Sequence, residues 1–521
     1  MNRFNIYIIA GLFFVFGITI GVNMNYILNY LGFNSDNLKK YNSLVNYVKN
    51  RYYADINIDS LVDESTKELI QKLDPHSAHI SKKELSIINE TMEGVFVGIG
   101  ISFKMINDSL TVLSVMKNGP SQIAGIYPGD RILIANGDTL FNKNLDNNEI
   151  ISKLKGKENT VVDLDIYRNS NKKIFSKKIS RGKVPIKSVI AYKLMQKTGY
   201  IKVERFGKNT HDEFINSFRK LNENEKIENL VLDLRNNPGG FLFSAEKIVD
   251  QFFSSKKTIL ITETKRGVRD TFFTTNKGVF RKGNLYILVN GQSASASEVV
   301  AGAVQDNKRG TIIGRRTFGK GLVQQHLPLG GGDVVKLTTS RYYTPSGKSI
   351  QRSFSDGNEE YFNQANNLNY HDSEDINKLK IKDSSNIKYN SKDENFRGGI
   401  SPDIQVKIAN KSDELDKSIL NNIITNFVYT YLDSNRDNFF KGSKKEYLNL
   451  SIDYFDTAYQ KFKKLNSDKK LFDDLSKNKT YIKNSIKAYY GFLLFGEEVL
   501  FEIFNDDDEY IKIAINSIDK S

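Results

Sequence analysis

The chain contains no cysteine, and it has only five histidines among its 521 residues. The absence of cysteine excludes disulfide bonds, a thiol nucleophile, zinc sites with cysteine ligands and a lipid-modified N-terminal cysteine. The five histidines are scattered and form no H-E-x-x-H motif, so a metalloenzyme site has little to be built from. We therefore expect no metal centre.

The charge of the chain is basic, with 75 Lys and Arg against 61 Asp and Glu and a net charge of +14. Nucleic-acid-binding proteins gather such charge into a patch or stripe. Here the basic residues are interspersed with Asn, Asp and Ser, which indicates a lysine-rich solvated surface instead. The length exceeds that of one core, and at roughly 100–200 residues per domain it predicts three or four units.

The N-terminus is apolar over residues 7–22, and no charge occurs between Arg3 and Asp36. This run is long enough to cross a bilayer, which needs about 20 apolar residues. A cleaved signal peptide is the alternative, but no A-x-A site follows the run. We expect an uncleaved signal anchor at residues 1–30, with the rest of the chain on the extracytoplasmic, periplasmic side of the inner membrane.

The rest of the chain divides by its sequence texture. Residues 31–92 have an amphipathic helical pattern, and residues 93–182 consist of short β-rich runs with turn signals. In residues 183–412 β-rich runs alternate with helical stretches, which predicts a multidomain α/β protein with layered architecture. Within that part, residues 353–396 are rich in Asn, Ser, Asp and Lys and predict an exposed, partly disordered insertion. Residues 413–521 are predicted to form a C-terminal helical appendage.

An apolar strand predicted at residues 230–234 leads into a turn that contains Pro238, Gly239 and Gly240. Proline lacks an N–H group and glycine permits positive φ, so the turn can present unpaired backbone N–H groups. Such groups suit one half of an oxyanion hole. An ordinary strand-to-helix connection is the alternative for this segment alone.

A second apolar strand, at residues 285–289, ends before a run of small residues that opens a helix. Ser293, Ser295 and Ser297 lie in this run. A hydroxyl at a strand–turn–helix junction is typical of a hydrolase nucleophile, and the first helical turn favours a developing negative charge. The residues alone do not choose among the three serines, and one of them is expected to cap the helix.

Lys320 lies between two glycines on an otherwise apolar strand. Burial of a lysine disfavours its ammonium form and lowers its pKa, which allows the amine to act as a general base. Gln324 is placed to hold that amine in line. A solvated loop lysine is the alternative.

In this order the three segments resemble the C-terminal processing peptidases, which are tail-specific serine peptidases of the Ser–Lys class. The resemblance runs from about residue 41 to residue 406. It implies that Ser295 is the nucleophile, that Lys320 is the general base 25 residues later (320 − 295), and that Gln324 is the partner of the lysine.

The same resemblance implies further site residues. The oxyanion donors are expected at Ala296 and in the turn of Gly239 and Gly240, with Gly240 preferred, and Asp306 is expected to have a supporting structural role. The resemblance also implies a catalytic domain related to the crotonase-type β-β-α spiral. The polar insertion lies between two matching segments and is expected not to touch catalysis.

Residues 93–182 resemble a PDZ domain. Its carboxylate-binding loop is expected at Gly98, Ile99, Gly100 and Ile101, where a peptide C-terminus would add as a strand to an exposed edge. Arg131 lies where related enzymes link the PDZ and catalytic domains. A purely scaffolding domain is the alternative.

The sequence thus predicts a membrane-tethered serine endopeptidase that needs no metal or organic cofactor. Its expected partners are unstructured or damaged proteins with exposed C-termini, the membrane, and an adaptor or activator protein, but not nucleic acid. A PDZ adaptor that binds tails without cutting them is the main rival. A histidine base, His326 or His211, is disfavoured because a triad requires a histidine at a turn with a carboxylate partner.

Overall fold

The structure is a computed structural model. It describes residues 36–143, 145–223, 225–367, 398–407, 411–466 and 478–520. Two compact units are present, residues 1–73 and residues 74–521. The expected anchor at residues 1–30 lies outside the described residues, and no helix in the described ranges is long and apolar enough to span a membrane.

The described part of the first unit, residues 36–73, contains two helices, α2 (Asp36–Arg51) and α3 (Ile58–Gln71). Asn57 caps α3 by accepting a hydrogen bond from the Ser60 N–H at 3.2 Å. The helical prediction for residues 31–92 is confirmed for these helices and for α4 (Lys82–Glu93) in the second unit. It is wrong at Ala78–Ile80, which form strand β1 because they pair with a strand that the sequence places more than 250 residues away.

The second unit is built around a six-stranded sheet. Its order is β10 (Val189–Met195), β11 (Thr198–Val203), β12 (Asn229–Asp233), β15 (Asn284–Val289), β16 (Thr311–Gly314) and β19 (Ile404–Gln405). All neighbours are parallel except β10 and β11. Strands that are covered on both faces read as continuous apolar runs, which is how the sequence revealed them.

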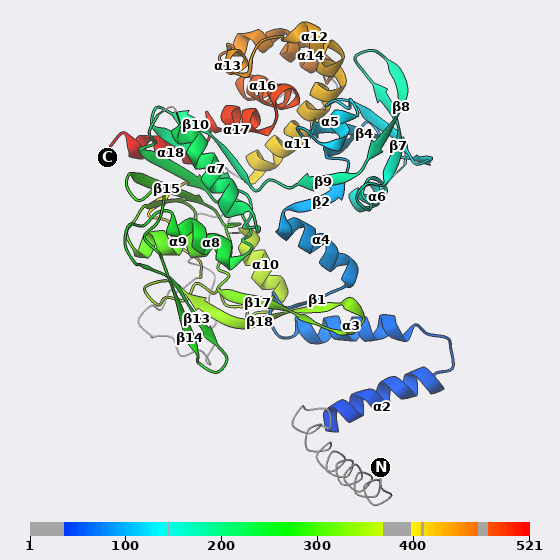
Figure 1. The fold of residues 1–521 in the computed structure, drawn as a ribbon, viewed down its shortest axis with the longest axis vertical. Helices are drawn as coiled ribbons and strands as arrows, with labels where there is room; N and C mark the ends of the chain where they lie inside the picture. Colours follow the sequence, from blue (N-terminus) through cyan, green and yellow to red (C-terminus); the bar gives the residue numbers. More distant parts are fainter. Residues whose placement is uncertain are drawn as a thin grey trace, which may run out of the picture. The chain divides into compact units, whose positions relative to one another are not determined.

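Helices cover both faces of this sheet (Figure 1). One face packs against α7 (Thr210–Asn222), α8 (Leu242–Asp250) and α9 (Ala296–Asp306). The other face packs against α18 (Glu509–Ile518), with α17 (Glu497–Asn505) beside it. The result is the layered α/β architecture that the sequence predicted.

A second, antiparallel sheet lies at one end of the peptidase region. Its order is β1, β18 (Val334–Tyr343), β13 (Thr258–Thr264) and β14 (Arg269–Phe273), and β17 (Leu322–Pro328) also pairs with β18. This sheet carries the chain that follows Lys320.

The PDZ-like region forms a sheet of its own. Its order is β3 (Ile101–Ile106), β4 (Ser109–Val115), β5 (Arg131–Ala135), β7 (Val161–Arg168) and β8 (Lys173–Ser180), and β6 (Asp138–Thr139) pairs with β5. Helices α5 (Pro120–Ile123) and α6 (Asn147–Leu154) accompany it, and β2 (Val95–Gly98) pairs with β9 (Gly182–Pro185). Strand β3 lies at the edge of the sheet.

The C-terminal residues are helical but are not an appendage, so that prediction is wrong. Helices α11 (Lys411–Phe427) and α16 (Lys479–Phe495) belong to a core that also includes Ile106 of the PDZ-like sheet. Further along, Ile511 and Ala514 of α18 complete the core on the second face of the catalytic sheet. The physical reason is that this face is apolar and must be covered.

The prediction of an exposed, partly disordered insertion at residues 353–396 is also wrong over part of that range. Residues Asn358–Asn367 form helix α10, and Tyr361 within it is only 1% exposed. The composition did not reveal this contact, because Tyr361 and Phe362 lie among polar residues and form no aliphatic stripe. Residues 368–397 lie outside the described residues.

Candidate active site

Ser295 lies at the junction of a buried strand and a helix. Strand β15 ends at Val289, and α9 begins at Ala296. Ser295 has φ +56° and ψ −113°, a backbone conformation that a residue with a Cβ adopts only at an energetic cost. Strain of this kind persists where the surrounding structure enforces it, which is common at active sites.

The three serines of this run differ in what their hydroxyls do. Ser293 is buried and donates to the Leu234 carbonyl at 2.8 Å, and Ser297 is buried and donates to the Asn237 carbonyl at 2.9 Å. Both therefore fasten the helix to the preceding strand and turn. Ser295 is the one of the three whose side chain is partly exposed.

The glycine turn lies directly against Ser295. Gly239 has φ +103°, and a Cβ placed on it would lie 2.8 Å from the Cβ of Ser295. Its own N–H donates to the Asn237 side chain at 2.8 Å. The N–H groups of Gly240 and Ala296 have no acceptor within the described part of the chain. Two unpaired N–H groups thus flank Ser295, and Gly240 rather than Gly239 supplies the one in the turn.

A carboxylate and a hydroxyl join the Ser295 segment to the Lys320 segment. The Oε2 atom of buried Glu298 accepts from the Ser295 N–H at 2.8 Å and from the Lys320 N–H at 2.9 Å. On the carbonyl side, the Tyr342 hydroxyl donates to the oxygens of Ser295 at 3.0 Å and Lys320 at 2.7 Å. The backbones of the two residues are therefore held a few ångströms apart from two directions.

Glu298 is itself a perturbed group. Burial raises its pKa to about 7, although hydrogen bonds from Thr317, Lys320, Gly319 and Ser295 oppose this by stabilising the carboxylate. The Thr317 hydroxyl and the Gly319 N–H bind the Oε1 atom at 2.6 and 2.7 Å. Every donor around the carboxyl group belongs to one of the two segments that it connects.

Lys320 has the environment of a base. Burial lowers the pKa of its amine to about 8, the nearby Lys336 lowers it further, and Glu298 and Asp74 raise it. The Lys320 amine makes no hydrogen bond to any of the described residues, so it does not engage the Ser295 hydroxyl in this conformation. Catalytic hydrogen bonds are often long without substrate and tighten when it binds.

Gln324 makes no hydrogen bond to Lys320 among the described residues. It lies on β17, and its amide donates to the Thr338 hydroxyl at 3.3 Å. The expected supporting residue Asp306 lies at the end of α9, where its carboxylate accepts from the Ser346 N–H at 2.9 Å. Gln324 is thus beside the site, and Asp306 fixes a loop.

The sequence analysis missed five residues around Lys320. They are Asp74, His76, Glu298, Lys336 and Tyr342. A charged residue inside the run of small, apolar residues that opens α9 was a usable signal for Glu298. No local signal identified the others, because they come from distant segments.

The two histidines that were weighed as bases lie elsewhere. His326 is exposed on β17, and the ring of His211 contacts the neighbouring Asp212 at 3.1 Å. Neither makes a hydrogen bond to Ser295 among the described residues.

The expected PDZ loop lies where the chain passes from β2 to β3. Gly98 ends β2, Ile99 and Gly100 form the connection, and Ile101 begins edge strand β3. Within the described ranges, no acceptor occupies the N–H groups of Ile99 and Gly100. A peptide carboxylate and its backbone could therefore be met by this loop and edge.

Arg131, expected between domains, lies on β5 near Asp433 of the C-terminal helices. The charge of Arg131 thus acts on the C-terminal region of the second unit.

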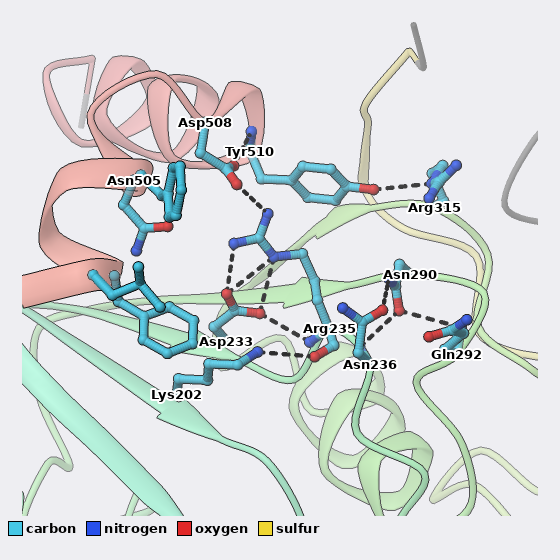
Figure 2. A pocket seen from close by; sticks show the side chains of 13 residues that line it. Lys202, Asp233, Arg235, Asn236, Asn290, Gln292, Arg315, Asn505, Asp508 and Tyr510 are labelled. Carbon is cyan, nitrogen blue, oxygen red and sulfur yellow. Dashed lines mark hydrogen bonds and ion pairs between the residues drawn. The ribbon is translucent and has the colours of Figure 1, made fainter. Parts of the chain in front are cut away.

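A cavity of about 440 Å³ lies at the carboxyl ends of the catalytic strands, between them and the C-terminal helices (Figure 2). Arg235 crosses it, binding Asp233 at 2.6 Å and Asp508 at 2.7 Å. Arg235 lies shortly before the glycine turn, and Asp508 caps the start of α18. The ion pairs of Arg235 with Asp233 and Asp508 therefore connect the segment before the turn to the start of α18.

Comparison with known proteins gives matches in both regions. Residues 197–357 match peptidase family S41, and residues 97–179 match the PDZ domain. A probable CtpA-like serine protease of Staphylococcus aureus (strain MRSA252) is 36% identical over 60% of this chain and 62% of its own length. The carboxy-terminal processing protease CtpB of Bacillus subtilis (strain 168) is 31% identical over 58% of this chain and 64% of its own length. The alignments thus span less than two thirds of these relatives.

A solved structure titled photosystem II D1 C-terminal processing protease is 23% identical and covers 70% of this chain and 86% of its own. Its TM-score of 0.37 is too low to support an argument about the fold. The two sequence matches do not depend on it. Residues 197–357 are thus similar to peptidase family S41 and residues 97–179 to the PDZ domain, and the resemblance of the chain to the C-terminal processing peptidases is confirmed.

Proposed function

We propose that the chain is a serine endopeptidase in which Ser295 is the nucleophile and Lys320 the general base. The observation that carries this proposal is the double bridge between the two residues. One oxygen of Glu298 accepts from both N–H groups, and one hydroxyl of Tyr342 donates to both carbonyls. Such a bridge positions a strained, partly exposed serine beside a buried lysine.

The reaction follows from these positions. The neutral amine of Lys320 takes the proton of the Ser295 hydroxyl, and the oxygen attacks the peptide carbonyl carbon. The N–H groups of Gly240 and Ala296 stabilise the oxyanion that forms. The C–N bond then breaks, and the Lys320 ammonium gives its proton to the leaving amine.

Hydrolysis of the acyl-enzyme repeats these roles. Lys320, neutral again, takes a proton from water, and the hydroxide attacks the ester carbonyl. Collapse of the second tetrahedral intermediate breaks the bond to Ser295, and the Ser295 oxygen takes back the proton from the Lys320 ammonium. The product leaves as a carboxylic acid, which then loses its proton to water. The amide nitrogen of Gln324 donates to Thr338, which leaves its amide oxygen as the group that can accept from the Lys320 amine, and substitution of Gln324 tests this role.

The substrate class follows from the PDZ domain. An open edge at β3 and the unoccupied N–H groups of Ile99 and Gly100 suit the C-terminus of an unstructured or damaged protein. We also propose that residues 1–30 tether the chain to the membrane and that the rest of the chain lies on the extracytoplasmic side. The proposal further includes an adaptor or activator protein as a partner and a catalytic core of the crotonase type.

The experiment is cleavage of an unstructured protein with an apolar C-terminus by wild type, Ser295→Ala, Lys320→Ala and Lys320→Arg. All three variants should lose activity, and Lys320→Arg should do so because a guanidinium stays protonated. Exposed Lys348 provides the control, since Lys348→Ala should cleave like wild type. Cleavage by Ser295→Ala at the wild-type rate contradicts the mechanism.

A tail-binding adaptor is the second candidate, because the Lys320 amine and the Ser295 hydroxyl make no hydrogen bond to each other in this conformation. Fluorescence anisotropy of a labelled C-terminal peptide separates the two functions. Binding without any cleavage by wild type would favour the adaptor.

A further inference from the structure

The buried tyrosine of helix α10 is the starting observation. Tyr361 is 1% exposed, whereas its neighbour Phe362 is 43% exposed, and the remaining residues of Asn358–Asn367 are polar apart from one alanine. Tyr361 is therefore the most deeply buried side chain of the helix among those that the structure describes. The mechanism described above makes no use of that side chain.

Tyr361 enters an aromatic and cationic cluster. Its hydroxyl lies 2.8 Å from His76 Nε2, and its ring meets those of His76 and Phe318 edge-on at centroid distances of 5.3 and 5.7 Å. The Arg352 guanidinium lies 4.9 Å from the Tyr361 ring and 4.7 Å from the Phe318 ring. A cation that contacts two aromatic faces fixes both rings.

Gln351 and Arg352, which come a few residues before α10 in the sequence, hold the backbone on each side of Lys320. The Gly321 N–H donates to the Gln351 side chain at 2.8 Å. The Arg352 N–H donates to the Gly319 carbonyl at 2.9 Å. Lys320 therefore lies between two backbone positions that Gln351 and Arg352 hold.

Tyr361 in turn contacts both of these supports. Its hydroxyl lies 3.4 Å from the Gln351 amide nitrogen, and its ring faces the Arg352 guanidinium. The same guanidinium also donates to the Phe318 carbonyl. A continuous set of contacts thus leads from α10 to the turn that carries the lysine.

The cluster also affects the electrostatics of Lys320. Burial is the main cause of the lowered pKa of its amine, and tightly packed rings around His76 exclude water from that side. His76 is neutral at neutral pH, because burial and the charge of Lys320 lower its pKa to about 3. The charged groups that act on the amine are Asp74, Glu298 and Lys336, and the charge of Lys320 in turn acts on His76.

We propose that Tyr361 is a positioning residue for Lys320, and that helix α10 thereby completes the active site. The proposal rests on the proposed function of Lys320 as general base. It differs from the expectation that the inserted segment does not touch catalysis.

The test compares Tyr361→Ala and Tyr361→Phe with Glu359→Ala, a change at an exposed position of the same helix. Tyr361→Ala should lower kcat by about 10–100-fold, because a misplaced base costs that much. It should also move the alkaline rise of kcat/KM upward by about one pH unit, because water then reaches the amine. Tyr361→Phe keeps the ring and should lower kcat by about two- to fivefold. Glu359→Ala should match wild type.

A second measurement does not depend on cleavage. The rate at which an amine-reactive reagent labels Lys320 is followed against pH by mass spectrometry, and its midpoint should rise by about one unit in Tyr361→Ala. An unchanged midpoint and kcat in that variant would overturn the positioning role. Failure of wild type to cleave would count against the proposed function alone.

Circular dichroism and thermal unfolding report whether each variant is folded. If Tyr361→Ala is unfolded, Tyr361→Phe tests the proposal instead. A wild-type kcat in Tyr361→Phe would mean that the contact between the Tyr361 hydroxyl and His76 does not position Lys320.

Discussion

Replacing the buried lysine should make the protein more stable while it abolishes activity. Methionine has an unbranched chain of similar volume and no charge, so Lys320→Met removes the ammonium with little change in packing. The residue is held in a site that disfavours its charged form. A gain in stability on losing a catalytic group is a common consequence of such a site.

The magnitude follows from the pKa. Burial lowers the pKa of Lys320 from its ordinary value of 10.5 to about 8. Each pKa unit corresponds to about 1.4 kcal/mol, so the difference amounts to about 3 kcal/mol against the folded state whenever the amine is protonated. The native protein binds this proton less tightly than the unfolded chain does. The loss of stability is therefore complete below about pH 8, shrinks between about pH 8 and 10.5, and is absent above.

The assay is urea unfolding of wild type and Lys320→Met at several pH values from 7 to 10. The variant should be more stable by up to about 3 kcal/mol at pH 7, and its advantage should shrink as the pH rises above about 8. Exposed Lys348 gives the control, because Lys348→Met should change the free energy of unfolding by less than about 0.5 kcal/mol. A Lys320→Met protein that is less stable than wild type at pH 7, or an advantage that stays constant up to pH 10, would refute the reasoning.

Three further substitutions test the surroundings of the site. Gly239→Ala should reduce kcat by about 100-fold or more, because the new Cβ would lie 2.8 Å from the Cβ of Ser295 in a backbone conformation that alanine avoids. Steady-state kinetics checks this, with circular dichroism to show that the variant is folded. Glu298→Gln should lower the free energy of unfolding by about 1–3 kcal/mol in urea as well as kcat, because an amide cannot accept all four hydrogen bonds, and unchanged values would contradict the bridging role. Asp508→Asn should lower the free energy of unfolding in urea by about 1–3 kcal/mol, because it weakens the ion pair with Arg235. An unfolding midpoint equal to that of wild type would mean that apolar packing alone holds α18.

The sequence predicted the parts of the fold whose signals are local. The apolar run at residues 230–234 and the strand at residues 285–289 were both found almost to the residue, because strands buried on both faces are continuously apolar. The strand at Ala78–Ile80 was missed, since three residues carry no period of their own and pair with β18 far along the chain. The role of α18 was missed for a similar reason, because an amphipathic helix does not reveal which face of which sheet it covers.

The same division applies to the site. Motif and spacing directed attention to Ser295 and Lys320, but the residues alone left Ser293 and Ser297 open as nucleophiles. The structure supplies the physical difference, because the hydroxyls of those two serines are buried and already donate to backbone carbonyls. The groups that set the charge state of Lys320 could not be read in advance, since Asp74 and its neighbours come from segments that only folding brings together.

The strained serine and the buried lysine are best understood as one energetic unit. Each is unfavourable by itself, the first through its backbone conformation and the second through desolvation. Neither could relax alone without breaking hydrogen bonds to Glu298 or Tyr342, because both residues use the same carboxylate oxygen and the same hydroxyl. The hydrogen bonds of each residue to Glu298 and Tyr342 therefore help to keep the other residue in its unfavourable state. Since Tyr361 supports the lysine side of this unit, loosening α10 should also be felt at Ser295, which is nowhere near it in the sequence.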